Sequence, residues 1–164
     1  MQQTKHTLQL NVNGTNIQRE VEPRTHLADF LRESELLTGT NLGCEHGVCG
    51  ACTIEMNTAP VRSCITYAIT CQNAKIRTIE GFDSDHIMTQ LKLAFTREHA
   101  LQCGYCTSGM LVSAHDIVIR KPNASADEVR EALAGNLCRC TGYAGIVRAI
   151  MSVLYAQANA TSNG

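Results

Sequence analysis

The chain has 164 residues, a formal net charge of −1, 44% hydrophobic and 18% charged residues. This length suits one ordinary domain or two small ones, and the composition is that of a folded protein. A near-neutral charge, 4% aromatic residues and no tryptophan provide neither a basic nor a stacking surface for nucleic acid. No apolar run reaches the length of a membrane span, so we expect no membrane partner.

The N-terminal segment has neither the apolar run of a signal peptide nor a twin-arginine motif, so we expect a cytoplasmic protein. Thiols stay reduced in that compartment. The nine cysteines of the chain therefore indicate metal or redox chemistry rather than a disulfide framework.

The first half of the chain predicts short strands. Apolar and polar residues alternate over 8–12, Asn13-Gly14 is typical of a two-residue hairpin turn, and Ile17 and Val21 follow in a returning strand. Further short strands are expected at 52–56, 60–65 and 75–80.

A short helix is expected after Pro23, with Thr25 as its cap. Its buried stripe would consist of Leu27, Phe30 and Leu31. This order of elements fits a small mixed sheet that carries one helix.

The second half predicts four helices. Ser125 and Glu128 form a capping box before the third helix, Gly135 stops it, and Pro122 ends the second. The chain beyond about Ala156 is expected to be a frayed tail. Apolar residues recur at helical spacing over 87–95, 110–118, 129–133 and 146–154. Four short helices can pack as a bundle, and the boundary between the halves is expected near 78–84.

Cys44, Cys49, Cys52 and Cys64 form a first quartet with the spacing C-x4-C-x2-C-x11-C. The C-x4-C-x2-C…C pattern is that of plant-type ferredoxins, which bind a [2Fe–2S] cluster. Glycines within the run allow the loop to curl and bring backbone N–H groups close to the sulfurs. A zinc site is the alternative, although zinc sites usually contain two C-x2-C pairs.

Cys103, Cys106, Cys138 and Cys140 form a second quartet with the spacing C-x2-C-x31-C-x-C. Each pair would lie at the start of a helix, where free N–H groups and the helix dipole favour an anionic thiolate cluster. By spacing alone this quartet also fits zinc. Cys71 lies outside both quartets and is interpreted as a buried or incidental thiol.

The stretches "CEHGVCGACT", "LQCGYCTSGM" and "GNLCRCTGYAGIVRAI" resemble the small iron–sulfur subunit of molybdenum hydroxylases, the xanthine dehydrogenase and carbon monoxide dehydrogenase small-chain family. The resemblance covers about residues 5–155. It implies an α+β fold: an N-terminal ubiquitin-like β-grasp domain of the plant-type ferredoxin kind, then a C-terminal four-helix bundle [2Fe–2S] domain. We place these domains at residues 1–80 and 81–164.

The resemblance also implies the cofactors and partners. Each domain would hold one [2Fe–2S] cluster, with the helical-domain cluster nearer a molybdopterin cofactor in a large subunit. The plant-type cluster would lie nearer the FAD of a medium subunit, in a complex expected to be a dimer of heterotrimers. By the same resemblance, Gln102 and Cys140 contact the pterin.

These expectations define an electron-transfer subunit without a catalytic site of its own. The holoenzyme would hydroxylate an N-heterocycle, a purine, an aldehyde, carbon monoxide or a related substrate with oxygen from water. A stand-alone electron carrier is one alternative, although ordinary ferredoxins contain only one of these domains. A zinc-binding interaction module without redox function is the other.

Overall fold

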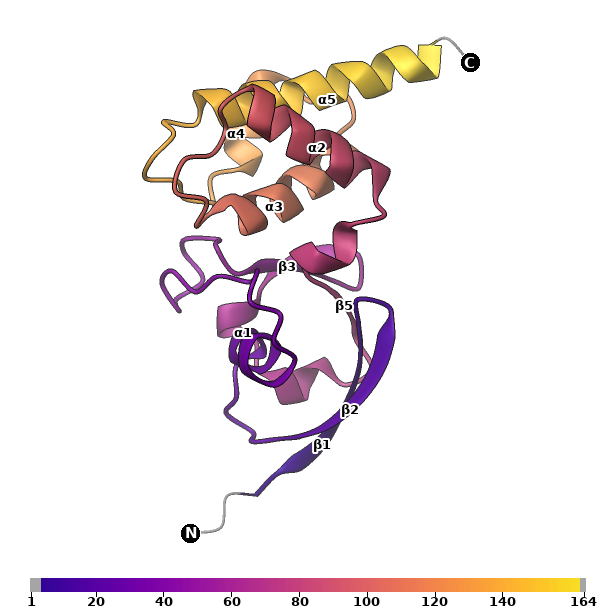
Figure 1. Cartoon of the computed structure of the whole chain (residues 1–164), viewed down its shortest axis with the longest axis vertical. Helices are drawn as coiled ribbons and strands as arrows, with labels where there is room; N and C mark the ends of the chain where they lie inside the picture. Colours follow the sequence, from indigo (N-terminus) through magenta and orange to yellow (C-terminus); the bar gives the residue numbers. More distant parts are fainter. Residues whose placement is uncertain (1–3, 163–164) are drawn as a thin grey trace.

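The structure is a computed structural model that describes residues 4–162. Figure 1 shows a sheet-containing half at the bottom and a helical half at the top. The described chain forms five strands: β1 His6–Val12, β2 Thr15–Val21, β3 Thr53–Met56, β4 Ala59–Arg62 and β5 Lys75–Arg77. They form one mixed sheet in the order β2-β1-β5-β3-β4, in which β1 and β5 are parallel. The predicted mixed sheet is confirmed.

The hairpin between β1 and β2 has the predicted two-residue turn. Val12 pairs with Thr15, which leaves Asn13 and Gly14 as the turn residues. Their φ angles are 51° and 86°. Two positive φ angles are the requirement of a type I′ turn, and asparagine followed by glycine meets it at low cost.

The predicted first helix is present but short. Helix α1 spans Leu27–Asp29 and continues into a π-helical turn at Phe30–Ser34. Thr25 is not its cap, because His26 occupies that position and makes no side-chain capping bond. Backbone pairing replaces the cap: Leu27 N–H donates to Thr66 C=O at 2.7 Å, and Thr25 C=O accepts from the N–H of Ala68 at 2.9 Å.

Two of the predicted strands end early. The strand expected over 60–65 ends at Arg62, and a 3₁₀ turn follows at Ser63–Ile65. The N–H and the hydroxyl of Ser63 both donate to Cys52 C=O, at 3.4 and 2.8 Å, and the ladder of β3 and β4 goes no further. The turn carries Cys64 toward Cys52, which a straight strand would not do.

The strand expected over 75–80 ends at Arg77, and a 3₁₀ turn follows at Ile79–Phe82. The side chain of Asn13 takes the place of a neighbouring strand. It accepts the N–H of Thr78 and donates to the Thr78 hydroxyl, both at 2.9 Å.

The helical half contains the four predicted helices: α2 His86–Arg97, α3 Thr107–Arg120, α4 Ala126–Ala132 and α5 Ala144–Ser162. The capping box of Ser125 and Glu128 is confirmed. The prediction of a frayed tail beyond about Ala156 is wrong, because α5 continues as a helix to Ser162. Gln157 on α5 donates to Gln90 on α2 at 2.8 Å, which anchors this part of α5 to its neighbour.

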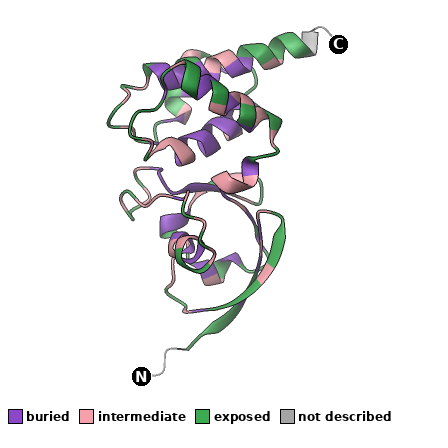
Figure 2. Ribbon diagram, in the orientation of Figure 1, coloured by how far each residue is buried: buried purple, intermediate pink, exposed green. Residues whose placement is uncertain are grey.

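Each half has its own hydrophobic core. In the sheet half, Leu8, Phe30 and Ile54 belong to one buried cluster between the sheet and α1. In the helical half, the side chains of Phe95 and Ile146 belong to another, which includes residues from all four helices. Figure 2 shows the buried face of α3, which lies against β3 and β4. No helix in residues 4–162 combines the length and apolarity that crossing a bilayer requires.

Asp85 stabilises the start of α2. Its carboxylate accepts the N–H of Met88 at 2.9 Å, pairs with Arg77 at 2.9 Å and lies 3.1 Å from Nε2 of the buried His115. We expect Asp85→Ala to lower the free energy of unfolding by about 1–2 kcal/mol at neutral pH, since it removes an N-cap and an ion pair. Chemical unfolding followed by circular dichroism measures this. Asp83→Ala is the control, because that side chain is 84% exposed and pairs with Lys92 alone.

The pH dependence of this effect has a definite sign. Burial opposes ionisation of Asp85, but the Met88 N–H, Arg77 and His115 outweigh it and hold the pKa of the carboxyl below its ordinary value. A carboxyl with a lowered folded pKa stabilises above its unfolded pKa of about 4, and this stabilisation disappears as pH falls through the folded pKa. The difference between wild type and Asp85→Ala should therefore shrink on acidification. A difference that grows in acid would contradict this role.

Candidate metal centres

The first quartet lies on a loop and a turn at the end of the sheet nearer the helices. Cys44 and Cys49 are half-buried in the loop, Cys52 directly precedes β3, and Cys64 lies in the turn after β4. The Sγ of Cys44 accepts the N–H groups of His46 and Cys49, each at 3.4 Å. The Cys49 N–H and then the His46 N–H lower the pKa of the Cys44 thiol to about 6. The loop is thus built to hold a thiolate.

The four sulfurs of this quartet form two pairs. The thiols of Cys44 and Cys49 interact directly, and so do those of Cys52 and Cys64. The second pair is 1% and 2% exposed and packs with Ala28. Burial raises the pKa of the Cys64 thiol to about 12 in the absence of a metal, so a bound cation must offset the cost of deprotonating it.

The loop requires glycine for close approach. A Cβ on Gly43 would lie 3.0 Å from the Sγ of Cys49. Gly50 has φ +73°, and a Cβ there would lie 2.5 Å from the carbonyl oxygen of Gly135. The glycines therefore allow the loop to curl round its sulfurs, as predicted from the sequence. They also allow the loop to lie against the helical half.

The second quartet also consists of two pairs. The Sγ atoms of Cys103 and Cys140 are 3.6 Å apart, and both residues are exposed. Cys106, the N-cap of α3, interacts with Cys138 in the loop before α5. The Thr141 hydroxyl donates to the Sγ of Cys138 at 3.1 Å. Cysteines 32 or more positions apart in sequence thus meet at the helix starts, where the sequence predicted them.

The pKa values of the inner pair, Cys106 and Cys138, shift in opposite directions although burial opposes ionisation of both thiols. Burial and then Cys138 raise the pKa of the Cys106 thiol to about 12. Burial also opposes ionisation of Cys138, but bonds from Thr141 and from the N–H of Cys140 outweigh it and lower the pKa of that thiol.

Paired sulfurs fit a two-iron cluster. Each iron of a [2Fe–2S] cluster takes two protein ligands, so the four thiols should form two pairs on opposite sides of the cluster. A single zinc ion instead needs its ligands gathered round one point. Both quartets therefore fit [2Fe–2S] chemistry better than the zinc alternative.

Comparison with known proteins gives the same assignment for each half. Residues 10–74 match the 2Fe-2S iron-sulfur cluster binding domain, and residues 78–151 match the [2Fe-2S] binding domain. The caffeine dehydrogenase gamma subunit of Pseudomonas sp. (strain CBB1) is 48% identical over 92% of both chains. The nicotine 6-hydroxylase small subunit of Paenarthrobacter nicotinovorans is 51% identical over 88% of this chain and 87% of its own.

A solved structure, that of quinoline 2-oxidoreductase from Pseudomonas putida 86, contains a chain with 48% identity and a TM-score of 0.88. The match covers 94% of this chain and 97% of that one. The chain belongs to the small iron–sulfur subunits of molybdenum hydroxylases. As such a subunit it contains two [2Fe–2S]-binding domains and serves an oxidoreductase complex without a catalytic site of its own. The resemblance stated from the sequence is confirmed.

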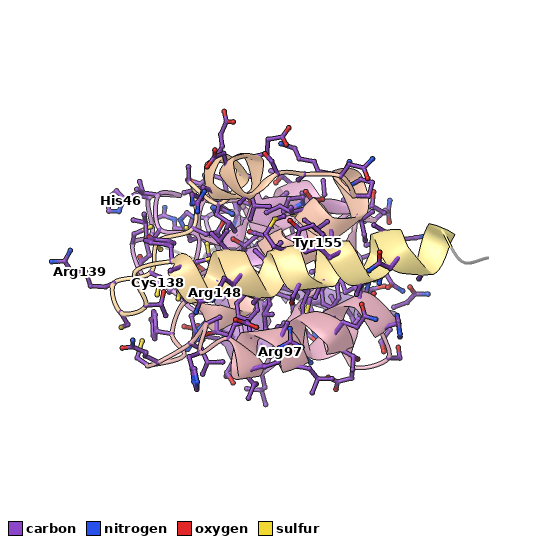
Figure 3. The ribbon with its side chains drawn as sticks, turned by 90° about the horizontal axis from the view of Figure 1, so that it is seen from above. His46, Arg97, Cys138, Arg139, Arg148 and Tyr155 are labelled. Atoms are coloured by element: carbon purple, nitrogen blue, oxygen red, sulfur yellow. The ribbon has the colours of Figure 1, made fainter. Side chains whose placement is uncertain are left out.

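The remaining candidate residues of this iron–sulfur subunit lie at different depths. Gln102 is exposed and directly precedes Cys103. Cys103 and Cys140 are the exposed, outer pair of the second quartet. Cys71 is buried in the core of the sheet half, as interpreted from the sequence. Figure 3 shows Cys138, Arg139 and His46 at the same end of the molecule, with Arg139 pointing away from the ribbon.

Sequence analysis missed the residues that join the two cluster loops of this subunit. Asn136 is 3% exposed and lies between the loop of the first quartet and α3. Arg62 donates to Gly135 C=O at 2.7 Å. The only signal in the sequence is the position of Asn136 two residues before Cys138, which does not distinguish it from an ordinary loop asparagine.

Proposed function

We propose that this subunit carries electrons from a molybdopterin cofactor in a large subunit to FAD in a medium subunit. Its two clusters would be held by the eight cysteines already paired above: Cys44, Cys49, Cys52 and Cys64 in the sheet half, and Cys103, Cys106, Cys138 and Cys140 in the helical half. When bound, each cluster supplies a one-electron redox centre. The chain supplies thiolates, N–H groups near the sulfurs and exclusion of water.

The exposure of the outer pair is the observation that carries this proposal. Cys103 and Cys140 reach the surface, and the neighbouring side chains of Leu101, Tyr105 and Leu137 are 40%, 51% and 49% exposed. Exposed apolar side chains round a polar site are typical of a surface covered by a partner. The outer pair is thus the side from which electrons would enter, and Gln102 and Cys140 would contact the pterin there.

The finer features of the proposal follow the resemblance. The two halves correspond to a β-grasp domain over residues 1–80 and a four-helix bundle over 81–164, supported by their separate cores. Relatives named for caffeine and nicotine favour an N-heterocyclic substrate within the broader set of purines, aldehydes and carbon monoxide. We place the complex in the cytoplasm as a dimer of heterotrimers.

Metal analysis tests the proposal. We expect about four iron and four sulfide per small subunit in anaerobically purified complex, since two clusters contain two of each. Electron paramagnetic resonance of the dithionite-reduced complex should show two distinct signals. Stoichiometric zinc with little iron would refute the iron–sulfur assignment. Two clusters without copurifying molybdenum and flavin would instead favour the alternative of a stand-alone electron carrier.

A further inference from the structure

A backbone hydrogen bond joins the loops of the two quartets. The N–H of Leu137 donates to the carbonyl oxygen of Cys49 at 2.8 Å. Leu137 directly precedes Cys138, so one peptide unit and one hydrogen bond connect a cysteine of the second quartet to a cysteine of the first. These cysteines are 89 positions apart in sequence.

The side chain of Asn136 fixes the position of this segment. Its Nδ2 lies 3.3 Å from Gly50 C=O, 3.4 Å from Thr53 Oγ1 and 3.2 Å from Gly109 C=O. Its Oδ1 accepts the hydroxyl of Ser113 at 2.9 Å and a guanidinium N–H of Arg62 at 3.3 Å. These partners come from the first cluster loop, from β3 and β4 and from α3, so one buried amide contacts both halves of the molecule.

The backbone segments round Asn136 lie so close together that a Cβ does not fit at Gly50 or Gly109. A Cβ on Gly50 would lie 2.7 Å from Nδ2 of Asn136 and 2.5 Å from Gly135 C=O. A Cβ on Gly109 would lie 2.2 Å from Gly50 C=O. Three backbone segments therefore meet round the Asn136 amide, and its N–H groups point at the carbonyl oxygens of Gly50 and Gly109.

We propose that Asn136 is a positioning residue that holds Leu137 N–H on Cys49 C=O and so maintains a bonded route for electrons between the two clusters. The inference rests on the proposed function, because it assigns the route within that electron-transfer chain. One electron would pass from the cluster that Cys138 would help to hold to the cluster that Cys49 would help to hold. No covalent bond and no proton changes place.

Asn136→Asp tests this role with almost no change in volume. One carboxylate oxygen can keep the contacts with Ser113 and Arg62. The other lacks N–H donors and is an acceptor held against the carbonyls of Gly50 and Gly109, so the segment should move away from the first cluster loop. We expect amide hydrogen exchange at Leu137 to speed up by about tenfold or more. In the dithionite-reduced complex, we also expect the magnetic splitting between the two cluster signals to diminish while both signals remain.

Asn41→Asp is the matched control. Asn41 Nδ2 donates to Tyr105 C=O at 2.9 Å, so it also joins the two halves, but it does not contact the Leu137 segment. This variant should keep both the splitting and the slow exchange. Ser113→Ala is a milder test, because it removes only the hydroxyl that Asn136 Oδ1 accepts, and it should give a smaller increase in exchange.

The outcomes separate the two proposals. Wild-type protein with zinc or without two cluster signals defeats the proposed function, while the exchange measurement still reports on Asn136. Two cluster signals with wild-type splitting and wild-type exchange in Asn136→Asp overturn the positioning role. If Asn136→Asp does not assemble its clusters, unchanged exchange and splitting in Ser113→Ala overturn it instead.

Discussion

Cys140→Ala is expected to remove one cluster and leave the other. Cys140 and Cys103 lie 3.6 Å apart and would share one iron, so alanine leaves that iron with a single protein ligand. The sheet-half quartet has its own core and its own loop, and it should still assemble. Iron content should fall from about four to about two per chain, and one of two paramagnetic signals should vanish.

This loss should also stop electron transfer from molybdenum even where the large subunit still binds. Reduction of the remaining cluster by substrate, followed by stopped-flow absorbance, measures it. Cys71→Ser is the control, because Cys71 is buried in the sheet core and belongs to neither quartet. Gln102→Ala should keep both signals and weaken cofactor binding by about 0.5–1.5 kcal/mol, the usual range for one hydrogen bond. Wild-type cluster reduction in Cys140→Ala would mean that electrons enter elsewhere.

Gly109→Ala is expected to destabilise the contact between the halves. Gly109 lies on α3, and a Cβ there would meet the backbone oxygens of Gly50 at 2.2 Å and of Ala51 at 2.8 Å. Alanine favours a helix over glycine by about 1 kcal/mol, so an isolated helix would gain stability. In the folded protein, overlap of the new Cβ with the backbone of Gly50 and Ala51 should outweigh this gain and lower the free energy of unfolding by about 1–3 kcal/mol. The overlap is with backbone atoms, so no flexible side chain can move aside.

Thermal unfolding of the purified complex and the splitting between the cluster signals measure this effect. Gly135→Ala is a milder change at the same contact, since its Cβ would meet the guanidinium of Arg62 at 2.7 Å. That side-chain end can shift where backbone cannot, at the expense of its bonds to Gly135 C=O and Thr53 Oγ1. Gly135→Ala should cost less than Gly109→Ala. Equal stability of wild type and Gly109→Ala would show that the two halves can separate slightly without penalty.

Local signals in the sequence were enough for the hairpin and the capping box. Each depends on residues that lie close in the chain, such as Asn13 with Gly14 or Ser125 with Glu128. The pairing of sulfurs could not be predicted, because Cys106 meets Cys138 only after α3 and the loop before α5 have packed.

Two errors in the predicted elements, the strand over 60–65 and the cap at Thr25, also come from contacts that form only in the folded protein. The strand predicted over 60–65 ends at Arg62, where the N–H and the hydroxyl of Ser63 both bond to Cys52 C=O and a 3₁₀ turn begins. Thr25 has the residue type of a cap, yet His26 is the N-cap residue and the N–H of Leu27 donates to Thr66 C=O instead. Tertiary hydrogen bonds override local preference at both places, and one of them helps to build the first metal centre.

The two sites differ in exposure, and this difference would decide which cluster is more easily damaged before the holoenzyme is assembled. The outer pair, Cys103 and Cys140, lies at the surface, whereas Cys52 and Cys64 are 1% and 2% exposed. In a newly made small subunit, dissolved oxygen and chelators would therefore reach the helical-half cluster first. Docking of the large subunit would act as its shield, so a cell that makes the small subunit in excess would accumulate chains damaged at that one cluster.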